Sequence, residues 1–169
     1  MSIEDKLRAV REWMAQEGLD ALVVPTDDPH GSEYLAEHWQ CRKWLTGFTG
    51  SAGTAVVTMN AAGLWTDSRY FLQAADQLQD SGFDLHKEDI PGEATVTEWL
   101  AEQMEENEIL AVDGRLFSIV KANQLEEFCC ANGFRFATDF APADTIWTDR
   151  PARPMSKAFV HDVKYAGEE

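Results

Sequence analysis

The stretch Leu19-Asp20-Ala21-Leu22-Val23-Val24-Pro25 decides the fold, because it is a short apolar run, rich in β-branched residues, that ends at a proline. Such a run predicts a buried β-strand. Proline has no N–H group for a sheet hydrogen bond, so we expect the chain to leave the sheet at Pro25.

A helix is predicted immediately before this strand. Its apolar positions recur at spacings of four, three and four residues, through Ile3, Leu7, Val10 and Met14. Ser2 followed by Asp5 is typical of a helix start, and Gly18 is typical of a helix end. A helix followed by a buried strand therefore opens the fold.

The same alternation continues along the chain. Five further strands are predicted, at Ala55–Met59, Leu64–Thr66, Phe83–Lys87, Ile109–Asp113 and Phe134–Ala137. Four further helices are predicted, over Glu33–Trp39, from Ser68 onwards, from the capping pair Thr95 and Glu98, and from Ser118 to Gly133.

This order favours an α/β fold, in which a mostly parallel or mixed sheet of six strands is flanked by helices on both faces. The second and third strands are joined by a hairpin loop at Asn60–Gly63, and only this pair is expected to be antiparallel.

Composition excludes several classes of protein. Of the 169 residues, 44% are hydrophobic, which argues against disorder, and the net charge of -16 argues against nucleic-acid and anionic membrane partners. Three cysteines, Cys41, Cys129 and Cys130, form no disulfide framework, and the first residues contain no continuous apolar stretch. We therefore expect a cytoplasmic protein.

The residue pattern offers few catalytic candidates. The four histidines are scattered, so no metal site is predicted, and His30 beside Asp27 and Asp28 is interpreted first as part of a turn. Ser51 lacks the first glycine of a nucleophile elbow. The glycines at 47, 50 and 53 are expected to serve backbone geometry rather than phosphate binding.

Arg69 is the most informative charged residue. It lies where a predicted strand leads into a predicted helix that Asp67 is expected to cap. In a first helical turn a cation opposes the helix dipole, so another interaction should explain Arg69. A bound carboxylate and a surface ion pair are the two alternatives.

Three segments form a recognisable pattern. They are Asp28-Pro29-His30-Gly31-Ser32-Glu33-Tyr34, followed by Arg42; Gly47-Phe48-Thr49-Gly50-Ser51-Ala52-Gly53-Thr54-Ala55; and Leu64-Trp65-Thr66-Asp67-Ser68-Arg69-Tyr70-Phe71-Leu72-Gln73-Ala74. Together they resemble the N-terminal domain of Xaa-Pro aminopeptidase, also called aminopeptidase P. Two later segments agree with this resemblance, namely Val112-Asp113 and Asp144-Thr145-Ile146-Trp147-Thr148-Asp149-Arg150-Pro151. The resemblance therefore covers nearly the whole chain.

The resemblance implies a creatinase-like N-terminal domain over residues 1–150, with a mixed six-stranded sheet flanked by helices and a ribonuclease H-like motif. It also implies a linker over 151–169 towards a missing domain. That missing domain would hold two metal ions, commonly manganese, so this chain alone should contain no catalytic or metal-binding residue. The whole enzyme would be a homo-oligomer that removes the N-terminal residue preceding proline from peptides. A free-standing binding or scaffold module is the alternative.

Residue roles follow from the same resemblance. Arg69 matches the arginine of the family's Trp-Thr-Asp-Gly-Arg-Tyr motif and is expected to face substrate, and Ser68 replaces the motif's glycine. Structural or interface roles are expected for six further positions, namely His30, Glu33, Tyr34, Arg42, Asp67 and Tyr70.

Overall fold

A computed structural model describes residues 1–167. Along the chain the elements are α1 (Ile3–Glu17), β1 (Ala21–Pro25), η1 (Glu37–Trp39), α2 (Cys41–Thr46), β2 (Thr54–Thr58), β3 (Ala62–Thr66), α3 (Phe71–Gln77), β4 (Asp84–Lys87), α4 (Val96–Gln103), β5 (Ile109–Val112), η2 (Gly114–Leu116), α5 (Ile119–Asn132), β6 (Arg135–Ala137), α6 (Pro142–Ile146) and η3 (Val163–Tyr165).

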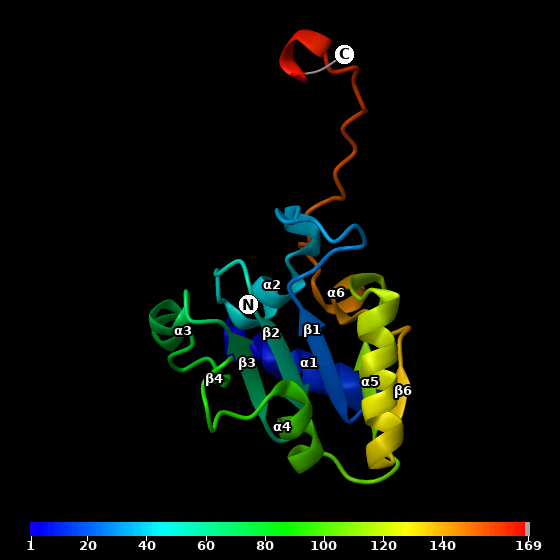
Figure 1. The fold of residues 1–169 in the computed structure, drawn as a ribbon. Coiled ribbons are helices and arrows are strands. Elements are labelled where there is room, and N and C mark those ends of the chain that lie inside the picture. Colours follow the sequence, from blue (N-terminus) through cyan, green and yellow to red (C-terminus); the bar gives the residue numbers. More distant parts are fainter. Residues whose placement is uncertain (168–169) are drawn as a thin grey trace.

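The six strands form one mixed sheet in the order β4-β3-β2-β1-β5-β6 (Figure 1). β2 runs antiparallel to both β1 and β3, whereas the other neighbouring pairs are parallel. The mixed six-stranded sheet is therefore confirmed. The expectation of a single antiparallel pair is wrong, because the reversed strand has two neighbours.

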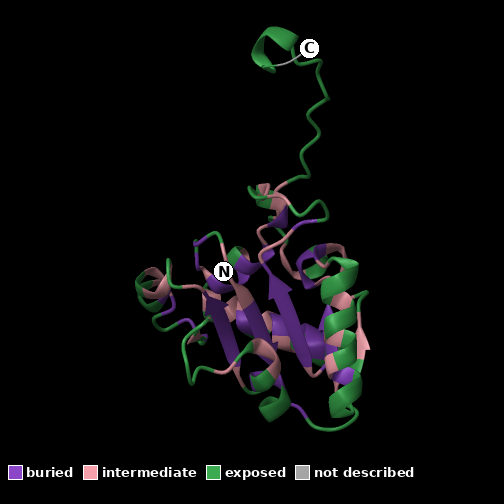
Figure 2. Cartoon of the chain, in the orientation of Figure 1, coloured by how far each residue is buried: buried purple, intermediate pink, exposed green. Residues whose placement is uncertain are grey.

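Helices cover both faces of the sheet, as predicted. Leu22 and Val24 point into a core shared with α1, α2 and α6, whereas Ala21 and Val23 point into a core shared with α4 and α5. Figure 1 shows α1 behind the sheet and α4 and α5 in front of it. Figure 2 shows that the central strands are buried while the outer face of α5 is exposed.

The predicted helix ends are confirmed where a capping side chain or a glycine defines them. The Ser2–Asp5 and Thr95–Glu98 pairs each form a capping box. Gly18 ends α1 with a φ of 68°. Positive φ is the conformation that glycine adopts without steric cost, so this helix end is specified by sequence.

The predicted helix over Glu33–Trp39 is wrong, since only the 3₁₀ turn η1 forms there and α2 follows it. The carboxylate of Asp28 accepts hydrogen bonds from the backbone N–H groups of His30 and Ser32. These bonds hold the segment after Pro29 as a loop, so that Ser32 begins no helix.

Two other boundaries differ from the prediction. The hairpin loop is Met59–Ala61 rather than Asn60–Gly63, and Gly63 lies within β3. A Cβ atom at Gly63 would lie 2.6 Å from the Trp65 ring, so glycine here makes room for a packed indole. α3 begins at Phe71 rather than Ser68, because the segment after Asp67 forms a turn first.

Residues 152–167 are exposed and extend away from the sheet (Figure 1). The assignment of 151–169 as a linker stays a prediction, and residues 168–169 lie outside the described range.

Candidate functional site

Three loops meet at one edge of the sheet, and they carry most of the predicted site residues. β1 and β3 end at this edge, whereas the reversed β2 begins there. The loop after β1 therefore lies beside the glycine-rich segment before β2 and the turn after β3. Side chains gather at this edge because the carboxyl ends of parallel strands are the usual place for binding loops in α/β folds.

Arg69 forms a two-pronged ion pair with Asp67. Its Nε and Nη2 donate to the two carboxylate oxygens over 2.9 and 2.7 Å, and its side chain is 65% exposed. Hydrogen bonding and charge from Arg69 lower the pKa of Asp67. Asp67 also accepts from the Arg69 backbone N–H over 3.0 Å, so it forms this turn instead of capping α3.

Arg69 therefore precedes the helix, and the expectation that it lies in a first helical turn is wrong. Within the described residues its side chain forms the surface ion pair with Asp67, which is one of the two alternatives. Ser68, which replaces the motif's glycine, has no positive φ, so the substitution introduces no backbone strain.

Tyr70 connects this turn to the glycine-rich segment. Its hydroxyl lies 2.7 Å from Ser51 Oγ, and this hydrogen bond lowers the pKa of Tyr70. On its other side the Tyr70 ring lies 5.2 Å from the Arg69 guanidinium. Within residues 1–167 the hydrogen-bond partner of Ser51 is this tyrosine and not a histidine, so the geometry offers Ser51 no general base.

Arg42 holds the glycine-rich segment in place through hydrogen bonds to its backbone. Its residue exposure is only 3%. The guanidinium donates to Thr26 Oγ1 over 2.9 Å and to the carbonyl oxygens of Phe48 and Gly50. Burial lowers the pKa of Arg42 to about 10. All three of these acceptors are neutral oxygens, which is unusual for a buried arginine.

Gly50 shows why this segment needs glycine. A Cβ atom at Gly50 would lie 2.2 Å from Cζ of Phe48, whose ring is fully buried. This close approach supports the interpretation that the glycines serve backbone geometry.

The segment around His30 is a turn, as its sequence predicts. Asp28 is buried and accepts from His30 N over 2.8 Å and Ser32 N over 3.1 Å, while Gly31 has a φ of 63°. Burial acts to raise the pKa of Asp28, but hydrogen bonding from Ser32 and His30 together with the charge of His30 outweighs it, and the net effect is a lowered pKa. The His30 side chain is exposed at the surface of this turn.

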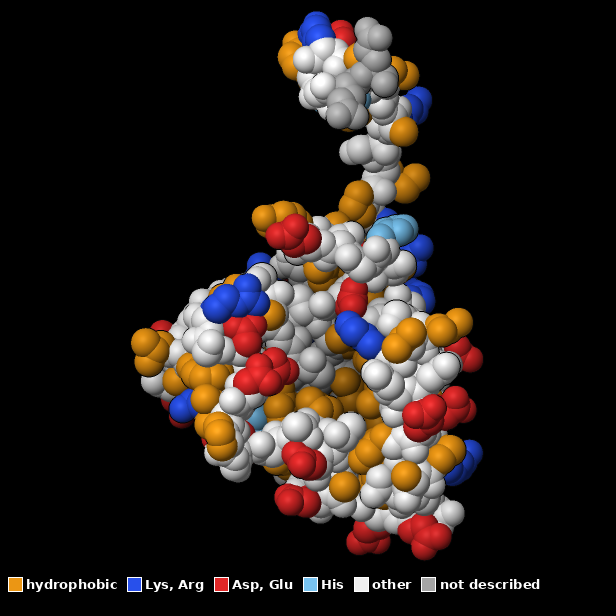
Figure 3. Space-filling model, viewed as in Figure 1, with side chains coloured by type: hydrophobic (Ala, Val, Ile, Leu, Met, Phe, Trp, Pro, Cys, Tyr) orange, Lys and Arg blue, Asp and Glu red, His pale blue; other side chains and the backbone are white. Residues whose placement is uncertain are grey.

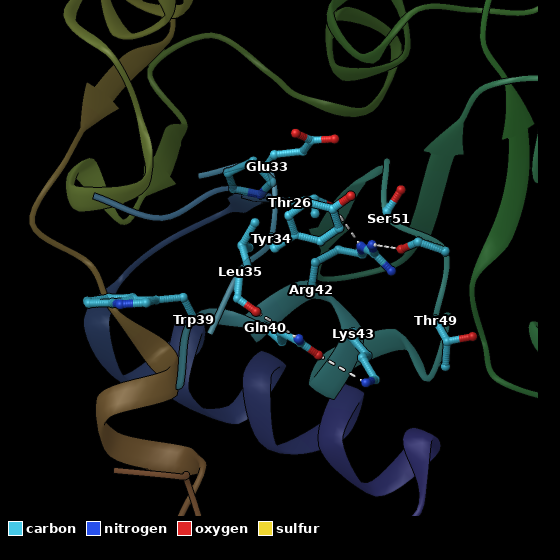
Figure 4. Close-up of a pocket in the computed structure, with 12 residues that line it drawn as sticks. Thr26, Glu33, Tyr34, Leu35, Trp39, Gln40, Arg42, Lys43, Thr49 and Ser51 are labelled. Atoms are coloured by element: carbon cyan, nitrogen blue, oxygen red, sulfur yellow. Dashed lines mark hydrogen bonds between the residues drawn. The ribbon is translucent and has the colours of Figure 1, made fainter. Parts of the chain in front are cut away.

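A pocket of about 200 Å³, here called the Arg42 pocket, opens beside this turn (Figure 4). It is lined by the end of β1, by Glu33–Leu35, by residues of η1 and α2, and by Thr49–Ser51. Tyr34 at its mouth is 86% exposed. Sequence reasoning selected Glu33, Tyr34 and Arg42 but not the pocket, because the lining residues come from four separate segments.

Sequence reasoning also missed a charged network behind the Arg42 pocket. Arg115 donates to both oxygens of Asp113 over 2.8 and 2.7 Å and lies 3.0 Å from Asp144, which also pairs with Arg150. The Arg150 guanidinium lies 5.3 Å from the centre of the Trp39 ring. The sequence signal for this network lies at Val112-Asp113 and Asp144–Arg150. The network ties α6 to the end of β5.

Charged side chains are distributed unevenly over the surface. Acidic side chains are scattered over the face shown in Figure 3, and several basic ones lie near the end of the molecule from which the tail leaves. Across residues 1–167, no group of three or more His, Cys, Asp or Glu side chains is arranged to hold a metal ion. The described residues therefore do not fit the paired metal ions of the resemblance.

None of the helices within residues 1–167 combines the length and the apolar character that a membrane span requires.

Comparison with known proteins extends the resemblance. A probable Xaa-Pro aminopeptidase P of Talaromyces stipitatus is 42% identical over 99% of this chain but only 26% of its own length. The crystal structure of X-prolyl aminopeptidase from Caenorhabditis elegans, described as a cytosolic enzyme with a di-nuclear active site, is 32% identical. It superposes with a TM-score of 0.90 over 99% of this chain and 29% of that one.

A separately crystallised N-terminal domain of a Corynebacterium diphtheriae metallopeptidase shares the fold, with a TM-score of 0.58 at 18% identity over 80% of this chain and 94% of its own. The chain thus spans about a quarter of the length of the curated relatives that it matches. The family model described as creatinase/prolidase N-terminal domain matches residues 6–147. On this match, together with the six-stranded sheet, the chain belongs to the creatinase/prolidase N-terminal domain family.

Proposed function

We propose that this chain is the non-catalytic N-terminal domain of a cytoplasmic Xaa-Pro aminopeptidase. In the whole enzyme it forms one wall of the substrate cleft and part of an oligomer interface. The substrate is a peptide with proline at its second position. Catalysis depends on two metal ions, commonly manganese, held by a domain outside this chain.

The geometry of Arg69 carries this proposal. Asp67 engages Nε and Nη2, which leaves Nη1 without a partner in the ion pair. The guanidinium is thereby oriented and still has N–H groups to donate to a peptide carbonyl or carboxylate. Its 65% exposure leaves it accessible from the solvent side. Asp67 is thus a positioning residue for Arg69.

Substituting Arg69 in the full-length enzyme tests the proposal. A hydrogen bond from a charged donor contributes about 1.5–3 kcal/mol. Arg69→Ala should therefore lower kcat/KM for short proline-containing peptides by about 10- to 100-fold. The free energy of unfolding should stay nearly unchanged, because exposed ion pairs contribute little to stability.

Arg8→Ala is the matched control, since Arg8 also forms an exposed pair, with Asp5 on α1, and its side chain is 66% exposed. This variant should leave kcat/KM unchanged. A loss of stability without a kinetic effect in Arg69→Ala would contradict the proposed contact with substrate.

The size of the native product tests the domain assignment. An antibody raised against this 19.0 kDa chain should detect a band several-fold larger in extract of the source cells. A band at 19.0 kDa would instead support a free-standing binding or scaffold module.

The oligomer contact is assigned to the loop that carries His30, Glu33 and Tyr34. Tyr34 is the best anchor because an 86% exposed tyrosine supplies a large apolar area and a hydroxyl. Tyr34→Ser in the full-length enzyme should lower the molecular mass in sedimentation equilibrium. An unchanged mass would remove this loop from the interface.

A further inference from the structure

We propose that the Arg42 pocket binds the C-terminal carboxylate of a short peptide whose last residue is apolar. This inference rests on the proposed function only in the choice of a peptide as ligand. The pocket is separate from the Asp67–Arg69 turn, and its binding can be measured on this chain without any catalytic activity.

The charge of Arg42 is the first observation. Arg69 and Arg115 each hold a carboxylate through two hydrogen bonds, whereas Arg42 donates only to a hydroxyl and two carbonyl oxygens. Three of the five guanidinium N–H groups are engaged, so two have no acceptor among the described residues. A buried cation without a counter-ion favours an anion that can reach it.

The shape of the pocket is the second observation. Pro25, Leu35 and Trp39 supply apolar walls, and Thr26 and Ser51 supply hydroxyl groups. A volume of about 200 Å³ is smaller than that of sites for drug-sized ligands, which start at about 300 Å³. The end of a peptide chain, with one side chain and its carboxylate, suits this size.

The local charge selects the kind of anion. Arg42 and Lys43 line the pocket, and its one acidic lining residue, Glu33, points its carboxylate away from the Arg42 guanidinium (Figure 4). The chain as a whole carries a net charge of -16, which repels polyanions at long range. A single carboxylate is therefore favoured over phosphates, and its two oxygens match a planar guanidinium.

The position of the pocket suits a peptide that also meets Arg69. Ser51 lines the pocket and is hydrogen-bonded to Tyr70, whose ring lies beside the Arg69 guanidinium. A peptide with its carboxylate in the pocket can therefore extend along Ser51 and Tyr70 towards Arg69.

Nuclear magnetic resonance titration of the ¹⁵N-labelled chain tests the proposal. The probes are the tripeptide Ala-Pro-Leu, the same tripeptide with a C-terminal amide, and acetate. We expect Ala-Pro-Leu to shift the amide signals of Thr26, Gly50 and Ser51 in a saturable way. The amidated tripeptide and acetate should each bind at least tenfold more weakly.

Other outcomes overturn the proposal. Equal binding of the amidated tripeptide would show that the carboxylate is not recognised. Acetate binding as tightly as the tripeptide would show an anion site without peptide recognition. Saturable shifts confined to residues outside the pocket would place the ligand elsewhere. None of these outcomes bears on the kinetic test of Arg69.

A variant that keeps Arg42 is needed, because replacing this buried residue could unfold the chain and so abolish binding for an unrelated reason. Leu35→Asp places a carboxylate in the wall of the pocket and should reduce Ala-Pro-Leu binding at least tenfold. Leu72→Asp is the control, because Leu72 on α3 is 89% exposed and lies outside the pocket lining. Undiminished binding to a folded Leu35→Asp chain would also overturn the proposal.

Discussion

Replacing Arg42 by methionine should destabilise the chain substantially. The substitution keeps an unbranched side chain but removes three hydrogen bonds, to Thr26 Oγ1 and to the carbonyls of Phe48 and Gly50. At about 1.5–3 kcal/mol for each bond from a charged donor, the loss is about 4–9 kcal/mol. Methionine carries no charge, so the variant avoids the free-energy cost of desolvating the Arg42 guanidinium, and this gain offsets part of the loss.

The desolvation cost follows from the lowered pKa of Arg42. A fall from 12.5 to about 10 corresponds to roughly 3 kcal/mol, at 1.36 kcal/mol for each pKa unit. The net expected loss is therefore about 1–6 kcal/mol, with a centre near 3 kcal/mol. For a domain of this size such a loss lowers the melting temperature by roughly 6–12 °C.

Urea unfolding followed by tryptophan fluorescence measures this loss. Lys43→Met is the control, since Lys43 is the next residue of the same helix and its one hydrogen bond, to Gln40, is exposed. That variant should change stability by less than about 0.5 kcal/mol. If Arg42→Met costs less than 1 kcal/mol at an unchanged m-value, the argument that neutral oxygens hold this cation is refuted.

Three further predictions follow from single positions. Gly50→Ala should lower the free energy of unfolding in urea by about 1–3 kcal/mol, because the buried Phe48 ring cannot move aside. The added Cβ of Gly31→Ala meets no atom within 4 Å, so this variant should lose only about 1 kcal/mol, from its positive φ. The stability advantage of the native chain over Asp28→Asn should be constant above pH 4 and shrink as the pH falls further, since the lowered pKa of Asp28 stabilises the fold only while the carboxylate is charged. Burial lowers the pKa of His86, whose buried Nε2 has no hydrogen-bond partner among the described residues, so stability should fall as the pH drops below 6.5. His86→Phe should abolish that pH dependence and raise the free energy of unfolding by about 1 kcal/mol at neutral pH. A pH-independent advantage at Asp28, or an unchanged slope in His86→Phe, would contradict these assignments.

The regular elements could be predicted because their signals are local. The residues from Ala21 to Val24 alternate between the two cores, and all five residues of β1 are buried. Caps such as Ser2 and Gly18 act within one helical turn. Burial pattern and capping therefore specify these elements before any long-range contact forms.

The loops could not be predicted because distant backbone groups hold them. Arg42 binds carbonyl oxygens, which every residue carries, so no sequence pattern identifies its partners. His38 likewise donates a hydrogen bond from Nδ1 to the carbonyl oxygen of Pro151, more than one hundred residues away along the chain. The helix expected at Glu33–Trp39 fails for a local reason instead, because Asp28 accepts hydrogen bonds from the backbone N–H groups of His30 and Ser32 just before it and holds that segment as a loop.

The reversed β2 explains why the candidate site lies where it does. In a fully parallel sheet the C-terminal end of β2 would lie between the C-terminal ends of β1 and β3. Here the start of β2 lies between them, so the glycine-rich segment meets Arg42 on one side and Tyr70 on the other. Arg42 binds that segment through two backbone carbonyls, so these two bonds do not depend on which side chains the segment carries. Tyr34 and Lys43 line the same pocket without taking part in these bonds, so substitutions there should change what the pocket binds while leaving the fold intact.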